Sequence, residues 1–539
     1  MTAAIDTPSD RTLGRASLWV AAGTALSRLT GFARVFALAY AIGQSPLADL
    51  YTKANFAPNL IFELVVGGVL SATLVPLFVD AREKRDDEAT SVLLSVGFVA
   101  SATLSLVALA ITFIVDLGWT AHLEGLAGDQ TEALTRFHIV TGLLYLMLPQ
   151  ILFYGISSLS TAYLNANRRY RTAAFAPVLT NLFTIVAFIV IGVQLQGESA
   201  ILAATDRNLS ALIWLGLGTT GGIVAMTIPM MLEVRRSEAD ISFLPRFRHR
   251  TIRRMTRLST WTFGYVIANQ LAMLSVIVFL GDNKRYADAF VFFQLPHGLV
   301  AVSIMTTMTP ELASAAARHD YQALADRFVK GLRLLAVLII PAAVGYVILA
   351  TPITSFLARG NFSQEDARLT GHVVAAFAVG LPAFSTYLFA CRGFYALSDT
   401  KTPFLLNVLE NGINIVGIVG LVAISADSST SFAAAYSVAY IVAAAAALWR
   451  FDQRLHQLDP TVQRPDLMPI AKMAAASAAM GLAVLLVRLI APGDSGLDAV
   501  LSVVAGVIVG GLVYGGAGLL LRVDEIERFV GRLRRSVGV

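Results

Sequence analysis

The sequence predicts an all-α membrane protein that crosses the bilayer many times. Of its 539 residues, 56% are hydrophobic and only 14% are charged, whereas a soluble domain has about 25% charged residues. Fourteen apolar segments are long enough to span a hydrocarbon core of about 30 Å as helices. The sequence lacks the alternation, over about ten residues at a time, that marks the strands of a membrane β-barrel.

The fourteen segments are separated by short polar loops, as expected for helices that run back and forth across a membrane. The second, fourth, eighth and tenth are long enough to tilt or to protrude from the bilayer. The segments lie approximately at residues 16–42, 48–79, 89–115, 135–165, 172–195, 209–233, 258–281, 287–315, 329–356, 370–397, 402–425, 430–450, 468–491 and 497–521.

The Lys and Arg content of the loops predicts the orientation. Loops that follow even-numbered segments carry most of the Lys and Arg, whereas residues 116–134 and 426–430 carry none. Lys284 and Arg285, after the seventh segment, are the exception. Because cytoplasmic loops are the basic ones in membrane proteins, we expect both termini in the cytoplasm.

An internal repeat relates the two halves of the chain. Six segments recur as six, and because six is an even number both copies have the same orientation in the membrane. Such a parallel repeat is typical of a two-lobed transporter, whose substrate path runs between the lobes. The matching pairs, about 230 to 240 residues apart, are Val178–Val186 with Val408–Val416, Leu148-Pro149 with Leu381-Pro382, and Ala48-Asp49 before Pro58 with Ala287-Asp288 before Pro296.

The repeat and the loop charges together predict the domain organisation. Two six-helix lobes are joined by an arginine-rich linker and are followed by two extra helices. The expected parts are a cytoplasmic N-terminal segment at 1–15, an N-lobe at 16–234, a cytoplasmic linker at 235–257, a C-lobe at 258–455, the two extra helices within 456–522 and a basic cytoplasmic tail at 523–539.

Signatures of enzymes and of nucleic-acid binding are scarce. Gly216–Gly221 fits the GxGxxG pattern, but it lies inside an apolar segment without a preceding strand, so we expect no nucleotide site. The net charge of +5 is distributed over short loops and does not indicate a nucleic-acid partner. The single cysteine, Cys391, excludes a disulfide within the chain. Gly506 and Gly510 form a GxxxG pattern that close helix packing explains.

Charged residues interrupt the first two segments. Arg28 and Arg34 lie in the first, and Asp49, Lys53 and Glu63 lie in the second. A charge at mid-membrane costs about 2.5–3.5 kcal/mol on insertion scales, so these side chains are expected to face a wet cavity and to bind substrate. The alternative is an internal salt bridge, such as Arg28 or Arg34 with Glu63, that only holds two helices together.

The spacing of the two arginines predicts a distorted first helix. Arg28 and Arg34 are six residues apart, which is about 120° around a straight α-helix. Both can face one cavity only if the helix is kinked or unwound, and Gly31 between them permits this.

The eleventh segment carries a second group of polar residues. Asn407, Glu410, Asn411 and Asn414 have spacings of three and four and therefore share one helix face. A carboxylate with amide oxygens can coordinate a small cation, so this face, completed by Asn269, is a candidate for coupling to a monovalent cation or a proton. The alternatives are coupling to the membrane potential, or a polar contact between helices; we expect no cofactor and no firm metal site.

Several stretches resemble motifs of the MurJ/MviN lipid II flippases, which belong to the multidrug/oligosaccharidyl-lipid/polysaccharide exporter superfamily. The resemblance covers roughly residues 15–455. The stretches are Ser27–Arg34, similar to SRxxGFxR; Asp49 followed by Pro58-Asn59-Leu60; Gln294–Gly298, similar to QLPxG; Leu357–Phe362, similar to the ERGAF loop; and Arg392–Pro403, similar to RAFYALxDTRTP.

The resemblance implies both a substrate and a pathway. The two extra helices would form a hydrophobic groove for a polyprenyl tail, and the substrate would be lipid II, an undecaprenyl-diphosphate peptidoglycan precursor. It would move from the inner to the outer leaflet of the bacterial inner membrane by alternating access, in support of cell-wall biogenesis and cell shape. Arg28, Arg34 and Asp49 match family positions associated with activity, and arginine is suited to bidentate phosphate contacts. Membrane lipids and cell-wall synthesis proteins would be further partners.

Two positions depart from the family pattern. Phe62-Glu63 stand where many members carry Arg-Arg, and Ala289 or Val291 stands where many carry the arginine of YADR. The missing positive charge needs a replacement if the substrate is a diphosphate. Candidates for that charge are Arg392, Lys53 and the loop at Arg359.

Other classes of protein that handle lipid-linked glycans or drugs would require different features of the sequence. The nearest alternatives are a flippase for another polyprenyl-linked glycan and a cation-coupled drug exporter of the same superfamily. A polyprenyl glycosyltransferase would need a large extramembrane loop with paired carboxylates, but the longest loops here have only about 25 residues. A membrane scaffold that only recruits cell-wall enzymes would have no use for charged residues inside the membrane, because each of them makes insertion less favourable. We therefore expect a transporter and not an enzyme.

Overall fold

The computed structural model describes residues 10–63, 74–124, 131–167, 169–195, 209–237, 240–426, 428–463, 466–490 and 492–528. These residues form helices joined by short turns, and none of them forms a strand. Twelve helical stretches among them are long and apolar enough to cross a membrane. The predicted class, an all-α protein with many membrane spans, is therefore confirmed. The chain separates into two compact units, Met1–Gln270 and Leu271–Val539.

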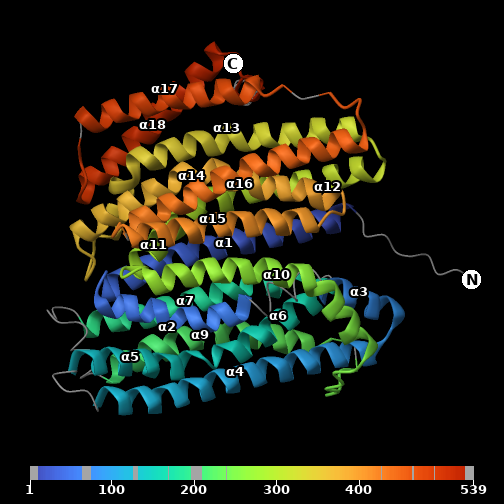
Figure 1. Cartoon of the computed structure of the whole chain (residues 1–539), viewed down its shortest axis with the longest axis vertical. Coiled ribbons are helices and arrows are strands. Elements are labelled where there is room, and N and C mark those ends of the chain that lie inside the picture. Colours follow the sequence, from blue (N-terminus) through green and yellow to red (C-terminus); the bar gives the residue numbers. More distant parts are fainter. Residues whose placement is uncertain are drawn as a thin grey trace, which may run out of the picture. The chain divides into compact units, whose positions relative to one another are not determined.

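The first unit is a bundle of helices that run alongside one another (Figure 1). α7 packs between α1 and α9, and α6 packs against α4 and α9. Pro149 separates α5 from α6 because it cannot donate a backbone hydrogen bond. The helices are α1 (Asp10–Ile42), α2 (Pro46–Phe62), α3 (Val75–Lys84), α4 (Asp87–Glu124), α5 (Thr131–Met147), α6 (Gln150–Ala166), α7 (Tyr170–Gln194), α9 (Leu209–Arg235) and the first part of α10 (Arg250–Phe279).

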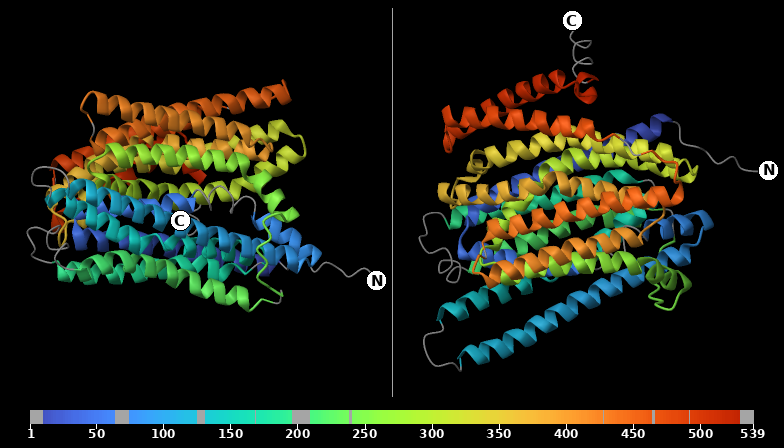
Figure 2. Two further views of the ribbon diagram at one scale, coloured as in Figure 1. Left: turned by 60° about the horizontal axis from the view of Figure 1, so that its bottom comes forward. Right: turned by 45° about the horizontal axis from the view of Figure 1, so that its top comes forward.

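The second unit is also a bundle of helices running side by side, as both further views show (Figure 2). α14 packs against α13 and α16, while α17 and α18 pack against each other and against α13. The helices after the end of α10 are α11 (Asn283–Pro296), the π-helical turn η2 (His297–Ala301), α12 (Val302–Ala317), α13 (Tyr321–Thr354), the 3₁₀ turn η3 (Ser355–Leu357), α14 (Gln364–Ala396), α15 (Lys401–Ala423), α16 (Ser429–Leu458), α17 (Met468–Ile490) and α18 (Gly496–Leu520).

Glycines in the apolar helices serve close packing. Gly221 lies inside α9, where an added Cβ would lie 2.6 Å from Cε1 of Phe183 on α7. The GxGxxG pattern is therefore part of a helix contact. In α18, an added Cβ at Gly510 would lie 3.0 Å from Cγ2 of Val484 on α17, as expected for small residues at helix interfaces in membranes.

Two of the fourteen predicted segments are not among the twelve spans. The second is divided between α2 and α3, and residues 64–73 between them lie outside the described residues. The seventh corresponds to α10, in which Phe263–Phe279 forms a shorter apolar stretch. The side chains of residues 257–262, just before it, lie outside the described residues.

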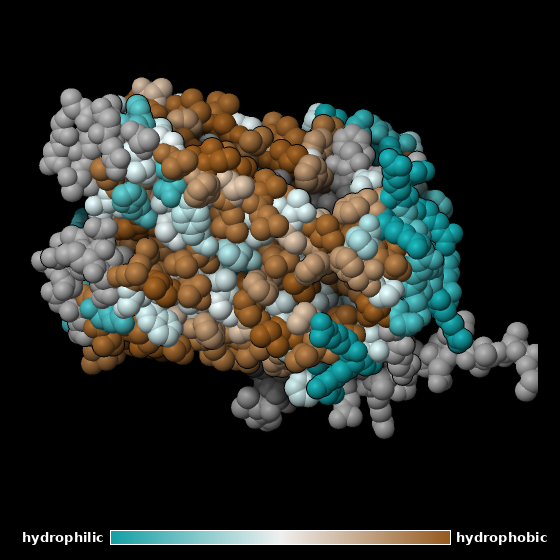
Figure 3. Space-filling view, turned by 90° about the horizontal axis from the view of Figure 1, so that it is seen from below, coloured by the Kyte–Doolittle hydropathy of each residue, from teal (hydrophilic) through white to brown (hydrophobic). Residues whose placement is uncertain are grey.

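The lipid-facing surface is visible on the described helices. α4 exposes large apolar side chains along its length, including Leu106, Ile114 and Leu117. In Figure 3 apolar side chains form a broad band across the face seen, and hydrophilic residues gather at one end of it. Such a band is what the hydrocarbon core requires of a spanning bundle.

The linker between α9 and α10 is fastened to the first unit. We call residues 240–254 the linker strap. The Ser91 hydroxyl on α4 accepts a hydrogen bond from the Ser242 N–H (3.1 Å), and the Ser95 hydroxyl accepts one from the Leu244 N–H (2.8 Å). These bonds satisfy backbone groups of an extended segment that has no partner strand.

Three arginine–carboxylate pairs complete the strap. Arg246 pairs with Glu88, Arg250 with Asp86 at 3.1 Å, and Arg254 with Asp80 at 3.0 Å. Asp80 also pairs with Lys84 at 2.7 Å. The hydrogen bond from Lys84, together with the charges of Lys84 and Arg254, lowers the pKa of the Asp80 carboxyl. Exposed pairs of this kind are individually weak, so the strap depends on several of them acting with the serine hydrogen bonds.

Candidate functional site

Several polar side chains of the first unit lie in the region of Arg34. Arg34 on α1 is half-buried and is within electrostatic range of Tyr51 on α2 and Tyr154 on α6. The Tyr154 hydroxyl donates to Oδ1 of Asn59 (3.0 Å), and the hydroxyls of Tyr51 and Thr219 lie 3.0 Å apart. The cluster presents a guanidinium, an amide and phenolic hydroxyls, which are groups that bind phosphate and sugar oxygens.

Sequence reasoning identified Arg34 but not its two tyrosines. Tyr51 lies two residues after Asp49, so its position on α2 offered a weak signal. Tyr154 lies in the apolar first half of α6, whose other polar residues are mostly small and uncharged, and its sequence context carries no signal for a site.

Arg28 lies one and a half turns before Arg34 on α1 and is exposed. The helix is anchored next to it by Asn181 on α7, whose amide donates to the Ser27 carbonyl (3.1 Å) and to the Thr30 hydroxyl (3.0 Å). α1 is helical without interruption from Asp10 to Ile42. The expectation of an unwound segment near Gly31 is therefore wrong, because these hydrogen bonds hold the helical backbone in register; a bend at this point stays a prediction.

The acidic residues of the second segment have different surroundings from those expected. Asp49 forms an ion pair with Lys53 one turn later, at 2.9 Å, and their side chains are 16% and 35% exposed. Glu63, at the end of α2, is exposed. In the part of the chain that the structure describes, neither Arg28 nor Arg34 forms an ion pair with Asp49 or Glu63. The interhelical salt bridge considered as an alternative is thus not formed between these residues.

The polar face of α15 is buried. Asn407, Glu410, Asn411 and Asn414 all lie in the interior, and the Asn411 amide donates to the Asn407 carbonyl at 2.9 Å. Oε2 of Glu410 and Oδ1 of Asn414 accept no hydrogen bond from a described residue. Oxygen atoms without donors are suited to a cation or a proton. Asn269 is half-buried on α10 and belongs to the first unit.

The remaining predicted residues lie at the surface of the second unit. Arg392, near the end of α14, and Arg359, in the loop before that helix, are both exposed. Among the described residues there is no group of three or more His, Cys, Asp or Glu side chains that could hold a metal ion.

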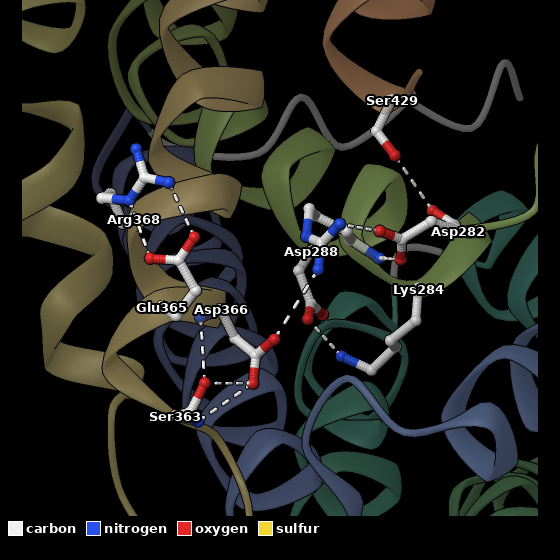
Figure 4. Close-up of polar contacts among 9 residues, drawn as sticks. Asp282, Lys284, Asp288, Ser363, Glu365, Asp366, Arg368 and Ser429 are labelled. Atoms are coloured by element: carbon white, nitrogen blue, oxygen red, sulfur yellow. Dashed lines mark hydrogen bonds and ion pairs between the residues drawn. The ribbon is translucent and has the colours of Figure 1, made fainter. Parts of the chain in front are cut away.

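A charged network joins the beginnings of three helices in the second unit (Figure 4). Lys284 and Asp288 on α11 form a buried ion pair, with side chains 2% and 5% exposed. Arg285 pairs with Asp282 and lies 3.6 Å from a carboxylate oxygen of Asp366 on α14. The two basic residues that are the exception to the loop-charge rule are therefore each paired with an aspartate nearby.

Further hydrogen bonds join the N-terminal ends of α14 and α16 to this network. Ser363 caps α14, with a reciprocal hydrogen bond between its own backbone and the Asp366 side chain, and the Ser429 hydroxyl at the start of α16 donates to the Asp282 carbonyl at 3.2 Å. Figure 4 shows the Glu365–Arg368 pair beside them on α14.

The two lysine–aspartate pairs occupy matching places in the internal repeat. Asp49 and Asp288 correspond in sequence, and each pairs with a lysine one turn away on its own helix. In the first unit the lysine follows the aspartate and is partly exposed, whereas in the second it precedes the aspartate and is buried. One pair is thus accessible to a ligand, while the other is enclosed by protein.

An apolar cavity lies within the second unit. Its volume is about 410 Å³, and it lies among α13, α14, α16 and the start of α17. His297, which donates to or accepts from the Ser385 hydroxyl at 3.0 Å, lies beside it. The lining side chains are Leu332, Leu335, Ala336, Ile339, Ile340, Pro382, Ser385, Thr386, Leu448, Leu467, Ile470, Ala471 and Ala474.

Comparison with solved structures first defines the fold. The chain is similar in fold to the inward-facing conformation of a multidrug resistance MATE family transporter of the MOP superfamily, with a TM-score of 0.63 and 12% identity over 81% of this chain and 96% of that one. A solved structure of lipid II flippase MurJ matches with a TM-score of 0.73 and 21% identity, over 95% of this chain and 100% of that chain.

Sequence comparison then identifies the family. The model of the family described as lipid II flippase MurJ matches residues 38–510, and the chain belongs to this family. A lipid II flippase MurJ of Burkholderia cenocepacia is 29% identical over 72% of this chain and 75% of its own length. A probable lipid II flippase MurJ of Rhizobium meliloti is 26% identical over 74% and 73%, respectively.

Proposed function

We propose that this protein flips lipid II from the inner to the outer leaflet of the bacterial inner membrane. The observation that carries the proposal is the match of the MurJ family model to residues 38–510. The same match favours a flippase over a drug exporter. The transport step breaks no covalent bond of the substrate, so the protein acts as a transporter and not as an enzyme.

The diphosphate of lipid II determines what the protein must provide. Two phosphates cannot enter an apolar bundle without cationic partners, because an unpaired charge inside the membrane is too costly. Arg34, Arg28 and Lys53 supply these charges in the first unit, and Tyr154 and Asn59 supply hydrogen-bonding groups beside Arg34. Arg392 is a further candidate contact in the second unit.

The polyprenyl tail requires an apolar path. The cavity among α13, α14, α16 and α17 is lined almost entirely by apolar atoms, and α17 and α18 lie next to α13. We propose that these helices hold the tail while the head group crosses between two six-helix lobes by alternating access. In this arrangement the chain has fourteen spans, and both termini are cytoplasmic.

The buried face of α15 is the proposed coupling element. Glu410 and Asn414 present oxygen atoms without donors among the described residues, so binding of a monovalent cation or a proton there would relieve the cost of burying them. The expectation that Asn269 on α10 completes this group stays a prediction. Glu410→Gln should uncouple flipping from the ion gradient while retaining expression in the membrane.

The proposal is tested by depletion of the protein from its bacterial host. Lipid II should accumulate in the inner leaflet, and growth should be restored by the wild-type chain and not by Arg34→Ala. Arg136→Ala is the matched control, because Arg136 is an exposed arginine paired only with Glu132 one turn away. Accumulation of a different polyprenyl-linked glycan would favour the alternative substrate, to which the absence of arginine at Phe62-Glu63 and Ala289 also points.

A further inference from the structure

A polar cavity lies at the end of the second unit where α14, α15 and α16 meet. Its volume is about 480 Å³, within the range of small-ligand sites. By the loop-charge rule this end, which contains the loop after the tenth segment, is cytoplasmic. The lining residues are Phe394, Leu397, Ser398, Asp399, Lys401, Thr402, Arg450, Gln453, Arg454 and Gln457.

The cavity has an excess of positive charge. Lys401, Arg450 and Arg454 line it, and none of the three forms an ion pair with another described residue. The single carboxylate, Asp399, is already engaged: its two oxygens accept from the N–H (2.9 Å) and the hydroxyl (2.6 Å) of Thr402. Three cations thus face the cavity together with one carboxylate whose hydrogen-bonding capacity is largely used.

Two further features favour an anion at this place. Gln453 and Gln457 add amide donors. The Arg450 guanidinium lies 5.0 Å above the Trp449 ring, which reduces the number of orientations it can adopt.

We propose that this cavity binds a phosphate group, supplied by an anionic lipid head group or by a soluble phosphate. Arginine forks match phosphate oxygens in pairs, and Phe394 and Leu397 on the wall offer apolar contact to the glycerol or acyl portion of a lipid. The site is separate from the Arg28 and Arg34 positions, which belong to the first unit. Binding of a phosphate group in this cavity does not depend on whether the protein transports lipid II.

The test uses the purified full-length protein in phosphatidylcholine nanodiscs. Inorganic pyrophosphate is titrated by calorimetry, and phosphatidylglycerol retained by the protein is counted by native mass spectrometry. The variant Lys401→Gln/Arg450→Gln/Arg454→Gln should lose at least tenfold in affinity for the probe that occupies the cavity. Arg318→Gln is the control, because Arg318 is an exposed arginine at the end of α12 that does not line the cavity.

The two probes distinguish the sources of phosphate. A loss confined to phosphatidylglycerol identifies a lipid site, a loss confined to pyrophosphate identifies a soluble ligand, and a loss of both identifies recognition of the phosphate group itself. Unchanged binding of both probes in a variant with wild-type elution and unfolding temperature would overturn the proposal. If the triple variant misfolds, Arg454→Gln alone, at an exposed position of α16, provides the same comparison. Flipping of lipid II is assayed separately, so failure of either proposal leaves the other decidable.

Discussion

Replacing the two repeat-related lysines with methionine should separate a ligand contact from a structural pair. Lys53 and Asp49 are 2.9 Å apart but partly exposed, so their attraction is screened, and such pairs within one helix contribute about 0.3–1 kcal/mol. Lys53→Met should therefore shift the unfolding temperature very little. Flipping should nevertheless fall at least tenfold, because the accessible cation is lost.

Lys284→Met should have the opposite profile. Lys284 and Asp288 are almost completely buried, and removal of one partner from a buried pair costs about 3–5 kcal/mol. At about 2–4 °C per kcal/mol this predicts a fall of roughly 5–20 °C in the unfolding temperature. The double variant Lys284→Met/Asp288→Leu should recover most of this loss, since neither charge of the pair is then left unpaired in the interior.

The assay is fluorescence-detected size exclusion after heating, combined with flipping in proteoliposomes. The distinction between an accessible pair and a structural pair is contradicted if Lys53→Met lowers the unfolding temperature as much as Lys284→Met does. It also fails if the double variant is no more stable than Lys284→Met alone.

Three further predictions concern the first unit. Arg28→Ala and Arg34→Ala should each abolish growth support without loss of membrane insertion, and Arg34→Lys should rescue only partly because lysine lacks the planar fork; full growth of either alanine variant would remove that arginine from the substrate path. A cysteine at Ser45, in a background without other cysteines, should react with an impermeant thiol reagent from outside the cell, whereas labelling only from the cytoplasm would reverse the proposed orientation. Lys84 and Arg254 lower the pKa of Asp80, and the ion pair with Arg254 joins this carboxylate to the linker strap. The carboxylate therefore stabilises the strap above its ordinary pKa of about 4, and the strap should loosen only as the pH falls below that range; hydrogen exchange of the linker that rises already near pH 6 would contradict this.

Local patterns in the sequence predicted the helices well because each span is determined by its own composition. The spacing of Asn407, Glu410, Asn411 and Asn414 also placed four polar residues on one face of α15, and all four are buried. The second segment was predicted as one span. Its described portions are α2 and α3, and residues 64–73 between them lie outside the described residues, so the continuity of this span stays a prediction.

Contacts between distant segments were not predictable in the same way. Tyr154 approaches Arg34 across 120 positions of sequence, and the apolar face of α6 gives no information about which helix it meets. The i, i+4 spacing of Lys284 and Asp288 was visible, but their burial was not, because lysine and aspartate are rarely enclosed unless they are paired. Burial of that pair depends on the packing of α11 against α14 and α16, which sequence periodicity does not encode.

The linker strap limits how much slack the chain has between α9 and α10. Residues 236–249, between α9 and α10, could extend to about 45–50 Å as a free tether. The serine hydrogen bonds and arginine pairs fix most of this length to α3 and α4, and the chain passes from one unit to the other only later, within α10. The linker is therefore not a free tether: a displacement of the start of α10 from α3 and α4 would first have to break the serine hydrogen bonds and the arginine pairs.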